Sequence, residues 1–254
     1  MTETATQATR RFASLLLLIG AALLIIGNTT HPIDTDPTAT SRLDLATAGG
    51  WMAIHLTITA GILAVVGGLA VLPRAITHPL GSAYARLGAI AAIVGGTTLA
   101  IVFGALDGYG HATLAAQDVA GTDREAIETV ALALDTIDSG MTAIGILALF
   151  GIAMSAFGAA IVISRVVSRW LGWAALSIGL VGTATGLLFA TLGPTALVIN
   201  GLFRPVAMAA TLYFVVLAIA LRRSPPATAT VHHDVAGPSP RKRPDTDAMG
   251  TLPD

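Results

Sequence analysis

Residues 139–163 read SGMTAIGILALFGIAMSAFGAAIVI and contain no charged side chain. A helix needs about 20 apolar residues to cross the hydrocarbon core of a bilayer, so this stretch predicts a transmembrane helix. Stretches of the same character predict five more spans, at 12–30, 50–72, 84–106, 170–193 and 199–221. The predicted fold class is therefore all-α: a polytopic transmembrane helix bundle of six spans, with residues 1–223 as the membrane domain.

Composition supports a membrane protein and excludes several classes of chemistry. The chain is 54% hydrophobic and 11% charged, whereas about 25% of the residues in a soluble domain are charged. It contains no cysteine, which excludes disulfides, thiolate zinc sites and cysteine nucleophiles. A single lysine among the 14 basic residues suggests a GC-rich bacterial genome.

Basic residues gather on one predicted side of the membrane. Cytoplasmic loops are enriched in Lys and Arg, so this side is predicted to be the cytoplasm, with both termini in it and the plasma membrane as the location. Of the 14 basic residues, three fall on the outer side (Arg42, Arg124 and Arg204), and the cytoplasmic side holds the other eleven: Arg10, Arg11, Arg74, Arg86, Arg165, Arg169, Arg222, Arg223, Arg241, Lys242 and Arg243.

Two segments outside the spans have a character of their own. The outer segment 107–138 is predicted to be a loop that contains an amphipathic helix before the fourth span, because Thr122 to Glu125 matches a capping box and apolar residues then recur at helical spacing. The helix either covers the outer mouth of the bundle or runs into the fourth span, with a bend at Ser139-Gly140. Residues 224–254 are rich in Pro, Ser, Thr and charge, which predicts a disordered cytoplasmic tail.

The strongest candidate site lies just inside the outer end of the bundle. His55 and Arg204 are each predicted to lie roughly 5–8 Å inside the apolar layer, at matching depth. A charge inside a membrane is costly, so Arg204 is expected to face the bundle or to extend toward the interface. Asp107 and Asp138, at the outer ends of the third and fourth spans, are its natural partners. The alternatives are an ion pair that fixes the helices and a site for an anion or a headgroup.

Histidines near the outer side raise the question of a metal. His31, His55 and His111 are the weak candidates for ligands of a zinc, copper or iron ion or of a haem. No HxxxH or HExxH pattern places two ligands on one helical turn, so a neutral His55 that bonds to a neighbouring helix is the simpler interpretation. No cofactor is predicted.

The string Asp107-Gly108-Tyr109-Gly110-His111 is unusual in composition. In a helix it would stack Asp107 on His111 and could carry a proton or sense external pH. The two glycines favour a polar turn instead. Ten of the 15 acidic residues are predicted to share this outer side: Asp34, Asp36, Asp44, Asp107, Asp118, Asp123, Glu125, Glu128, Asp135 and Asp138.

Function follows only in outline from these residues. The chain has no Walker loop, dinucleotide-binding glycine pattern or GxSxG elbow. It offers no trail of ionisable residues through the spans, which disfavours ion transport. A non-catalytic sensor or assembly protein is predicted, with an outward polar and acidic pocket built from His55, Asp107, His111, Asp138 and Arg204. It would bind an extracytoplasmic small molecule or protein and no nucleic acid. The alternatives are a transporter of a neutral or lipid-like solute and a metal-dependent intramembrane enzyme.

Overall fold

A computed structural model describes residues 3–32, 50–117, 121–195 and 197–223, and all regular structure in these ranges is helical. The elements are α1 (Glu3–Thr30), α3 (Trp51–Val71), the 3₁₀ turn η1 (Leu72–Ala75), α4 (Pro79–Gln117), α5 (Thr122–Ile146), η2 (Leu147–Ala153), α6 (Met154–Ser164), α7 (Arg169–Leu192), η3 (Leu197–Phe203) and α8 (Arg204–Arg223). Both η2 and η3 are π-helical. The predicted tail 224–254 and the predicted outer positions Asp34, Asp36, Arg42, Asp44 and Asp118 lie outside the described residues.

Six of the helical stretches are long and apolar enough to cross a membrane, which confirms the predicted number of spans. They are Ala5–Thr30, Trp51–Ala75, Pro79–Gly104, Glu125–Ser164, Arg169–Leu192 and Leu197–Arg223. Large apolar side chains cover their outer faces: Trp170 is 81% exposed and Leu180 is 72% exposed. A surface of this kind suits lipid, and a helix satisfies its own backbone there. The fold is that of a multi-pass helical membrane protein.

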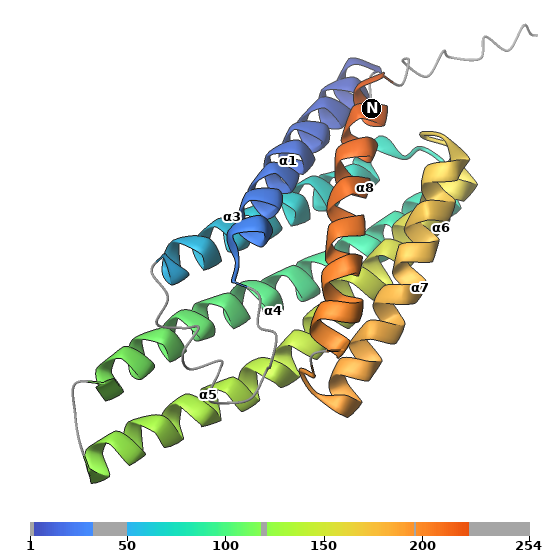
Figure 1. Cartoon of the computed structure of the whole chain (residues 1–254). Coiled ribbons are helices and arrows are strands. Elements are labelled where there is room, and N and C mark those ends of the chain that lie inside the picture. Colours follow the sequence, from blue (N-terminus) through green and yellow to red (C-terminus); the bar gives the residue numbers. More distant parts are fainter. Residues whose placement is uncertain (1–2, 33–49, 118–120, 196, 224–254) are drawn as a thin grey trace, which may run out of the picture. The chain divides into compact units, whose positions relative to one another are not determined.

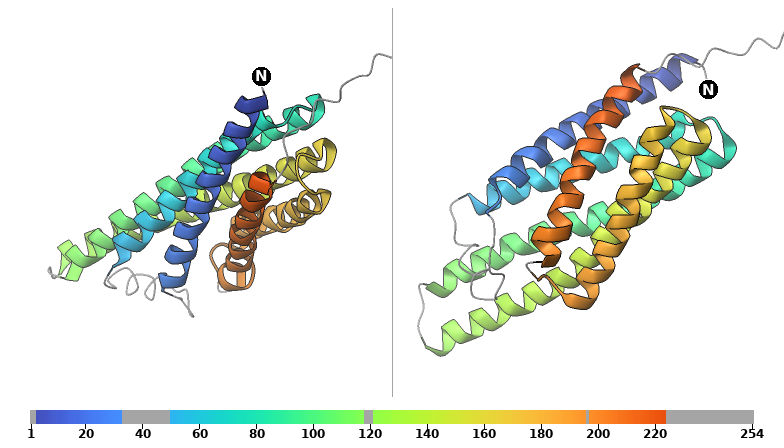
Figure 2. Two further views of the ribbon diagram at one scale, coloured as in Figure 1. Left: turned by 90° about the horizontal axis from the view of Figure 1, so that it is seen from above. Right: turned by 45° about the vertical axis from the view of Figure 1, so that its right-hand side comes forward.

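The spans are arranged in a ring (Figures 1 and 2). Each packs against the next along the chain: α1 on α3, α3 on α4, α4 on η2 and α6, α6 on α7, and α7 on α8. The last helix, α8, then returns to pack along α1. The ring therefore brings the first and last spans side by side.

Hydrogen bonds join α1 to α8 near the start of α1. The buried Ser14 hydroxyl donates to the Ala218 carbonyl oxygen at 2.8 Å. The same hydroxyl oxygen accepts a hydrogen bond from Nε of Arg222 at 2.9 Å. Because both bonds cross between the first and last spans, they fix the closure of the ring at this end.

Small residues allow the helices to approach closely. A Cβ added at Gly20 of α1 would lie 2.7 Å from the carbonyl oxygen of Gly61 on α3. One added at Gly182 would lie 2.6 Å from the backbone of Phe150. Glycine at such positions brings backbones together, which is a packing device common to membrane helices.

The outer segment 107–138 differs from its prediction as a loop. Helix α4 continues to Gln117, so the string from Asp107 to His111 is helical and the predicted polar turn is wrong. A glycine inside a helix costs about 1 kcal/mol. Helix α4 packs along α5, and this packing outweighs the local cost of Gly108 and Gly110.

The helix before the fourth span runs into that span, which is one of the two predicted alternatives, but it starts differently and has no bend at Ser139-Gly140. Helix α5 begins at Thr122 with Gly121 as its N-cap, so Thr122 is the first helical residue and not the N-cap residue that a capping box requires. It passes through Ser139-Gly140 as unbroken α-helix and runs into the fourth span. The departure from α geometry comes later, at η2.

Candidate functional site

Two chain segments meet at the carbonyl oxygen of Pro32. Nδ1 of His31 lies 2.8 Å from this oxygen, and a guanidinium nitrogen of Arg204 donates to it at 3.0 Å. A carbonyl oxygen only accepts, so His31 must carry its proton on Nδ1. These bonds join the end of α1 to the start of α8, and they close the ring of spans at the end opposite Ser14.

His55 extends this group from α3. Its Nε2 lies 3.3 Å from Nε2 of His31, and its side chain is fully buried. Because the Nδ1 proton of His31 is committed to Pro32, the Nε2 atom of a neutral His31 is an acceptor. His55 must then donate from its own Nε2.

Burial is the main cause that lowers the pKa of His31 below its ordinary value. The hydrogen bond to Pro32 opposes this effect, and the nearby positive charge of Arg204 adds to it. The neutral form of His31 is therefore favoured, so Arg204 supplies the positive charge of this polar group.

Aromatic side chains enclose the two imidazoles. The Trp51 ring meets His55 edge to face, with centroids 4.2 Å apart, and lies 5.7 Å from His31. Phe103 of α4 lies on another side of His55, at 5.4 Å. The spacing of Trp51 and His55, four residues apart on one helix, places them on the same face. The aromatic contacts hold the buried imidazole in one orientation.

A cavity of about 350 Å³ opens beside this polar group. His31 and Arg204 line one end of it with Asn28 and Thr29, and most of the remaining wall is apolar. At about 1.5 Å of rise per residue, the stretch of α8 from Arg204 to Phe214 is about 15 Å long. The cavity thus extends over roughly half of a 30 Å hydrocarbon core.

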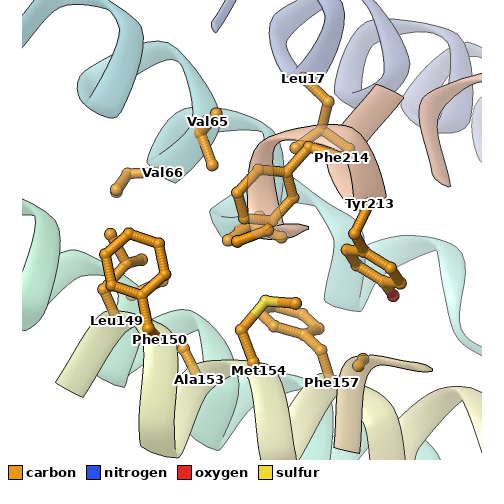
Figure 3. Close-up of a cluster of buried hydrophobic side chains, with 14 of the residues drawn as sticks. Leu17, Val65, Val66, Leu149, Phe150, Ala153, Met154, Phe157, Tyr213 and Phe214 are labelled. Carbon is orange, nitrogen blue, oxygen red and sulfur yellow. The ribbon is translucent and has the colours of Figure 1, made fainter. Parts of the chain in front are cut away.

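Buried side chains close the end of the cavity opposite His31 and Arg204 (Figure 3). Val65, Phe150 and Phe214 line it. Met154 and Phe157, which follow Phe150 along the chain, are almost fully buried and pack in the same cluster. The cavity is therefore a pocket with one polar end.

Both π-helical segments supply the cavity wall. Phe150 of η2 and Phe203 of η3 meet edge to face, with ring centroids 6.1 Å apart. Pro205 follows η3 and has no N–H for the carbonyl oxygen of Gly201, which accounts for a relaxed helical turn there. Single π-helical turns within α-helices occur frequently at functional sites, and two of them flank this cavity.

The structure brings together part of the predicted pocket. Arg204 lines the cavity, and His55 adjoins it through His31. Asp138, half-buried on α5, is not among the lining residues. Asp107 and His111 lie in the outer part of α4, where the structure describes the course of the helix but not their side chains.

Sequence reasoning missed the role of Pro32 and the apolar cavity. The sequence did indicate that Pro32 and Arg204 could meet, because the end of the first span and the start of the sixth were both predicted on the outer side. Nothing in the sequence indicated the cavity, since most of its wall consists of apolar residues of the kind found throughout the spans.

A metal site needs more ligands than the imidazole pair offers. Within the described residues, no group of three or more His, Asp, Glu or Cys side chains lies close enough to hold an ion. Arg204 also places a positive charge beside His31, which opposes a cation there.

Comparisons of the chain with protein-family models, with curated proteins and with solved structures gave no significant match.

Proposed function

We propose that this protein is a non-catalytic ligand-binding protein of the plasma membrane that takes up a single-chain amphiphile in its outward-facing cavity. The observation that carries the proposal is the cavity of about 350 Å³, which is apolar along its length and polar at the His31–Arg204 end. Small-molecule sites are typically apolar clefts of about 300–1,000 Å³ with a few placed polar groups. Because the basic residues follow the positive-inside pattern, both termini are placed in the cytoplasm.

The polar groups of the wall support an amphiphile rather than a polar solute. Asn28 donates its side-chain amide to Leu24, and Thr211 donates its hydroxyl to Ala207, each within its own helix. The Thr211 hydroxyl spends its one donor on the backbone of its own turn, whereas the Asn28 amide keeps a second N–H and an acceptor oxygen at the polar end of the cavity. The middle of the cavity therefore favours a hydrocarbon tail.

This arrangement supports binding better than the alternatives of transport and metal catalysis. The buried cluster of Met154, Phe157 and Phe214 closes one end of the cavity, so a ligand enters and leaves by the end that carries His31 and Arg204. Within the described residues, the imidazole pair beside Arg204 belongs to no group of three or more possible metal ligands.

Tryptophan fluorescence tests binding directly. Three tryptophans are present, and the double substitution Trp170→Phe and Trp173→Phe leaves Trp51 as the reporter beside His31. Single-chain amphiphiles with a nitroxide on the tail and an alcohol, carboxylate or trimethylammonium headgroup are added to this protein in phosphatidylcholine nanodiscs. Saturable quenching by at least one of them supports the proposal, and only linear partitioning by all three overturns it.

Two substitutions on α8 separate the cavity from the lipid-facing surface. Ala207→Phe places a ring in the cavity, which Ala207 lines, and should abolish the saturable phase. Leu212→Phe enlarges a side chain that is 57% exposed and should leave that phase unchanged. Equal effects of the two substitutions would place the binding site elsewhere.

A further inference from the structure

A second cleft lies at the end of the bundle opposite His31 and Arg204, where the start of α1 meets the end of α8 (Figure 1). Its volume is about 720 Å³, which falls within the range of small-molecule sites. Arg11 of α1 and Arg222 of α8 line it together, and none of the described residues that line it is acidic. The cleft therefore presents two permanent positive charges to a ligand.

Arg222 is held in place by the hydrogen bonds that join the two helices. Its Nε donates to the buried hydroxyl of Ser14, which donates in turn to the Ala218 carbonyl oxygen. This bond uses Nε alone, so the four N–H groups of the two terminal nitrogens are not committed to Ser14. A guanidinium can bind two oxygens of a phosphate group at once. Because Ser14 already fixes the side chain, the entropic cost of that binding is reduced.

Arg11 supplies the second charge from α1. Its side chain is exposed, and Gln7, one helical turn before it, also lines the cleft. Residues four apart share a helical face, so an amide that can both donate and accept lies beside the guanidinium. A phosphate that carries a glycerol hydroxyl matches this combination of donors and acceptors.

The apolar part of the cleft continues into the lipid-facing surface. Phe12 and Leu15 line the cleft and are 53% and 45% exposed. Ile19 and Ile26 follow at helical spacing on the same face of α1 and are also exposed. This stripe accommodates an acyl chain that extends from a headgroup in the cleft. A soluble phosphate compound would leave the stripe unused, so the stripe favours a lipid as the occupant.

We propose that the cleft between the start of α1 and the end of α8 binds an anionic phospholipid, whose phosphate contacts Arg11 and Arg222 and whose acyl chain lies along Phe12 and Leu15. The proposal is independent of the ligand in the outward-facing cavity. Basic pockets between membrane helices on the cytoplasmic side bind lipid headgroups, and the positive-inside pattern predicts this cleft on that side. A lipid bound across the two helices also supports the ring where its first and last spans meet.

Quenching of a tryptophan placed in the cleft tests the proposal. Phe12→Trp is the reporter, in a full-length chain whose natural Trp51, Trp170 and Trp173 are replaced by phenylalanine. The protein is studied in nanodiscs of phosphatidylcholine and phosphatidylglycerol, with bromine on the acyl chains of one lipid or of the other. The two series together give the affinity of the anionic lipid relative to the zwitterionic lipid. We expect a preference of at least about tenfold for phosphatidylglycerol, because the choline cation of the other lipid meets two like charges. Equal affinity for the two lipids overturns the proposal.

The control reporter is the natural Trp173, with the other two tryptophans replaced by phenylalanine and Phe12 retained. Trp173 lies in the first turns of α7, is 50% exposed and does not line the cleft. It reports the general attraction of anionic lipid to the basic side of the bundle, so its preference should be no more than about fivefold. The same preference at both reporters would mean that the cleft adds nothing to this general attraction, and would refute the proposed site.

Substitution of the arginines assigns the preference to the cleft. Arg11→Gln and Arg222→Gln should each lower the preference at the cleft reporter by about fivefold or more, since each removes hydrogen bonds to a charged group. Arg223→Gln removes the same charge from the same end of α8, but Arg223 does not line the cleft, so this variant should leave the preference nearly unchanged. Arg222→Gln also loses the bond to Ser14; if it fails to fold, Arg11→Gln decides, because Arg11 is exposed. An unchanged preference in Arg11→Gln, or an equal loss in Arg223→Gln, contradicts the proposal.

Soluble glycerol phosphate separates a lipid site from a site for phosphate alone. It has the same headgroup chemistry as the anionic lipid but no acyl chain, so it lacks the apolar contact with Leu15 and the rest of the stripe. At millimolar concentration it should not displace brominated phosphatidylglycerol from the cleft reporter. Recovery of the fluorescence on its addition would identify a phosphate site and overturn the lipid as the ligand.

Discussion

The Nε2 atoms of His31 and His55 lie 3.3 Å apart and connect the end of α1 to the first turns of α3. The hydrogen bond has a defined direction, from His55 to His31, because the Nδ1 proton of His31 is held by Pro32. The carbonyl oxygen of Pro32 also accepts a hydrogen bond from the guanidinium of Arg204. The imidazole pair is thus part of a group that joins α1, α3 and α8.

A double-mutant cycle should detect an interaction free energy between His31 and His55. His31→Ala and His55→Ala are expected to show a coupling free energy of unfolding of about 0.6–1.7 kcal/mol, between the average and the largest value found for hydrogen bonds between membrane helices. The measurement is unfolding of the single and double variants in mixed micelles.

The control cycle pairs His31 with His78. Nδ1 of His78 accepts a hydrogen bond from the backbone N–H of Gly81, and no contact between described residues connects His78 with His31, so these two substitutions should be additive. Additivity in the His31–His55 cycle as well would show that the pair contributes nothing beyond its separate contacts.

Stability should fall in mild acid because of His31. Its pKa is lowered in the folded protein, chiefly by burial, whereas it titrates near 6.5 when unfolded. Below about pH 6.5 the unfolded state binds a proton that the folded state refuses, so the stabilisation is complete above this pH and is lost progressively below it. Apparent unfolding temperature measured from pH 8 to pH 4.5 should therefore decline below about 6.5.

The comparison variant for this pH dependence is His31→Gln. Among the described residues, His55 and Arg204 are the ionisable groups that face His31, and both remain in the variant. The slope of stability against pH should be shallower in the variant, by at most about 1.4 kcal/mol per pH unit for a single proton. Identical slopes in the two proteins would assign the acid sensitivity to other groups.

The spans were predictable from sequence because hydrocarbon imposes one simple rule. A run such as 139–163 must satisfy its backbone internally, so it forms a helix whatever its neighbours do. The outer part of α4 followed no such rule. Gly108 and Gly110 favour a turn by local propensity, but α4 and α5 continue side by side past the span, and this tertiary packing overrides a local preference of about 1 kcal/mol per glycine.

Only the ionisable residues of the candidate site were predictable from the sequence. Arg204 and His55 stood out because ionisable residues in spans are expensive, and their predicted depths matched. His31 entered as a weak metal candidate, although in the structure it bonds to Pro32 and His55. The apolar wall, with Phe150 and Phe203 on π-helical segments, depends on helix packing that one sequence does not encode in any local pattern.

Close contact between α1 and α3 should make Gly20 intolerant of a methyl group. A Cβ there would lie 2.7 Å from backbone atoms of Gly61 and Val65, and backbone cannot yield as a flexible side chain can. Gly20→Ala should cost about 1–3 kcal/mol of unfolding free energy, as overpacking does. Gly67→Ala is the control, because its nearest contact would be an ordinary 3.4 Å to the side chain of Leu16. This second substitution should be neutral or stabilise by up to about 1 kcal/mol through helix propensity. Equal losses at the two positions would argue against the close approach.

The orientation of the bundle can be tested with single cysteines, since the natural chain has none. Glu125 and Ser168 are both exposed, and they flank the continuous helix that runs from Thr122 to Ser164 through α5, η2 and α6. The positive-inside pattern places Glu125 outside and Ser168 in the cytoplasm. A membrane-impermeant maleimide should therefore label Glu125→Cys in right-side-out vesicles and should label Ser168→Cys only after the vesicles are opened. The reverse pattern would invert the bundle and place the cavity mouth toward the cytoplasm. Labelling of both positions in sealed vesicles would mean that the helix between them does not cross the membrane.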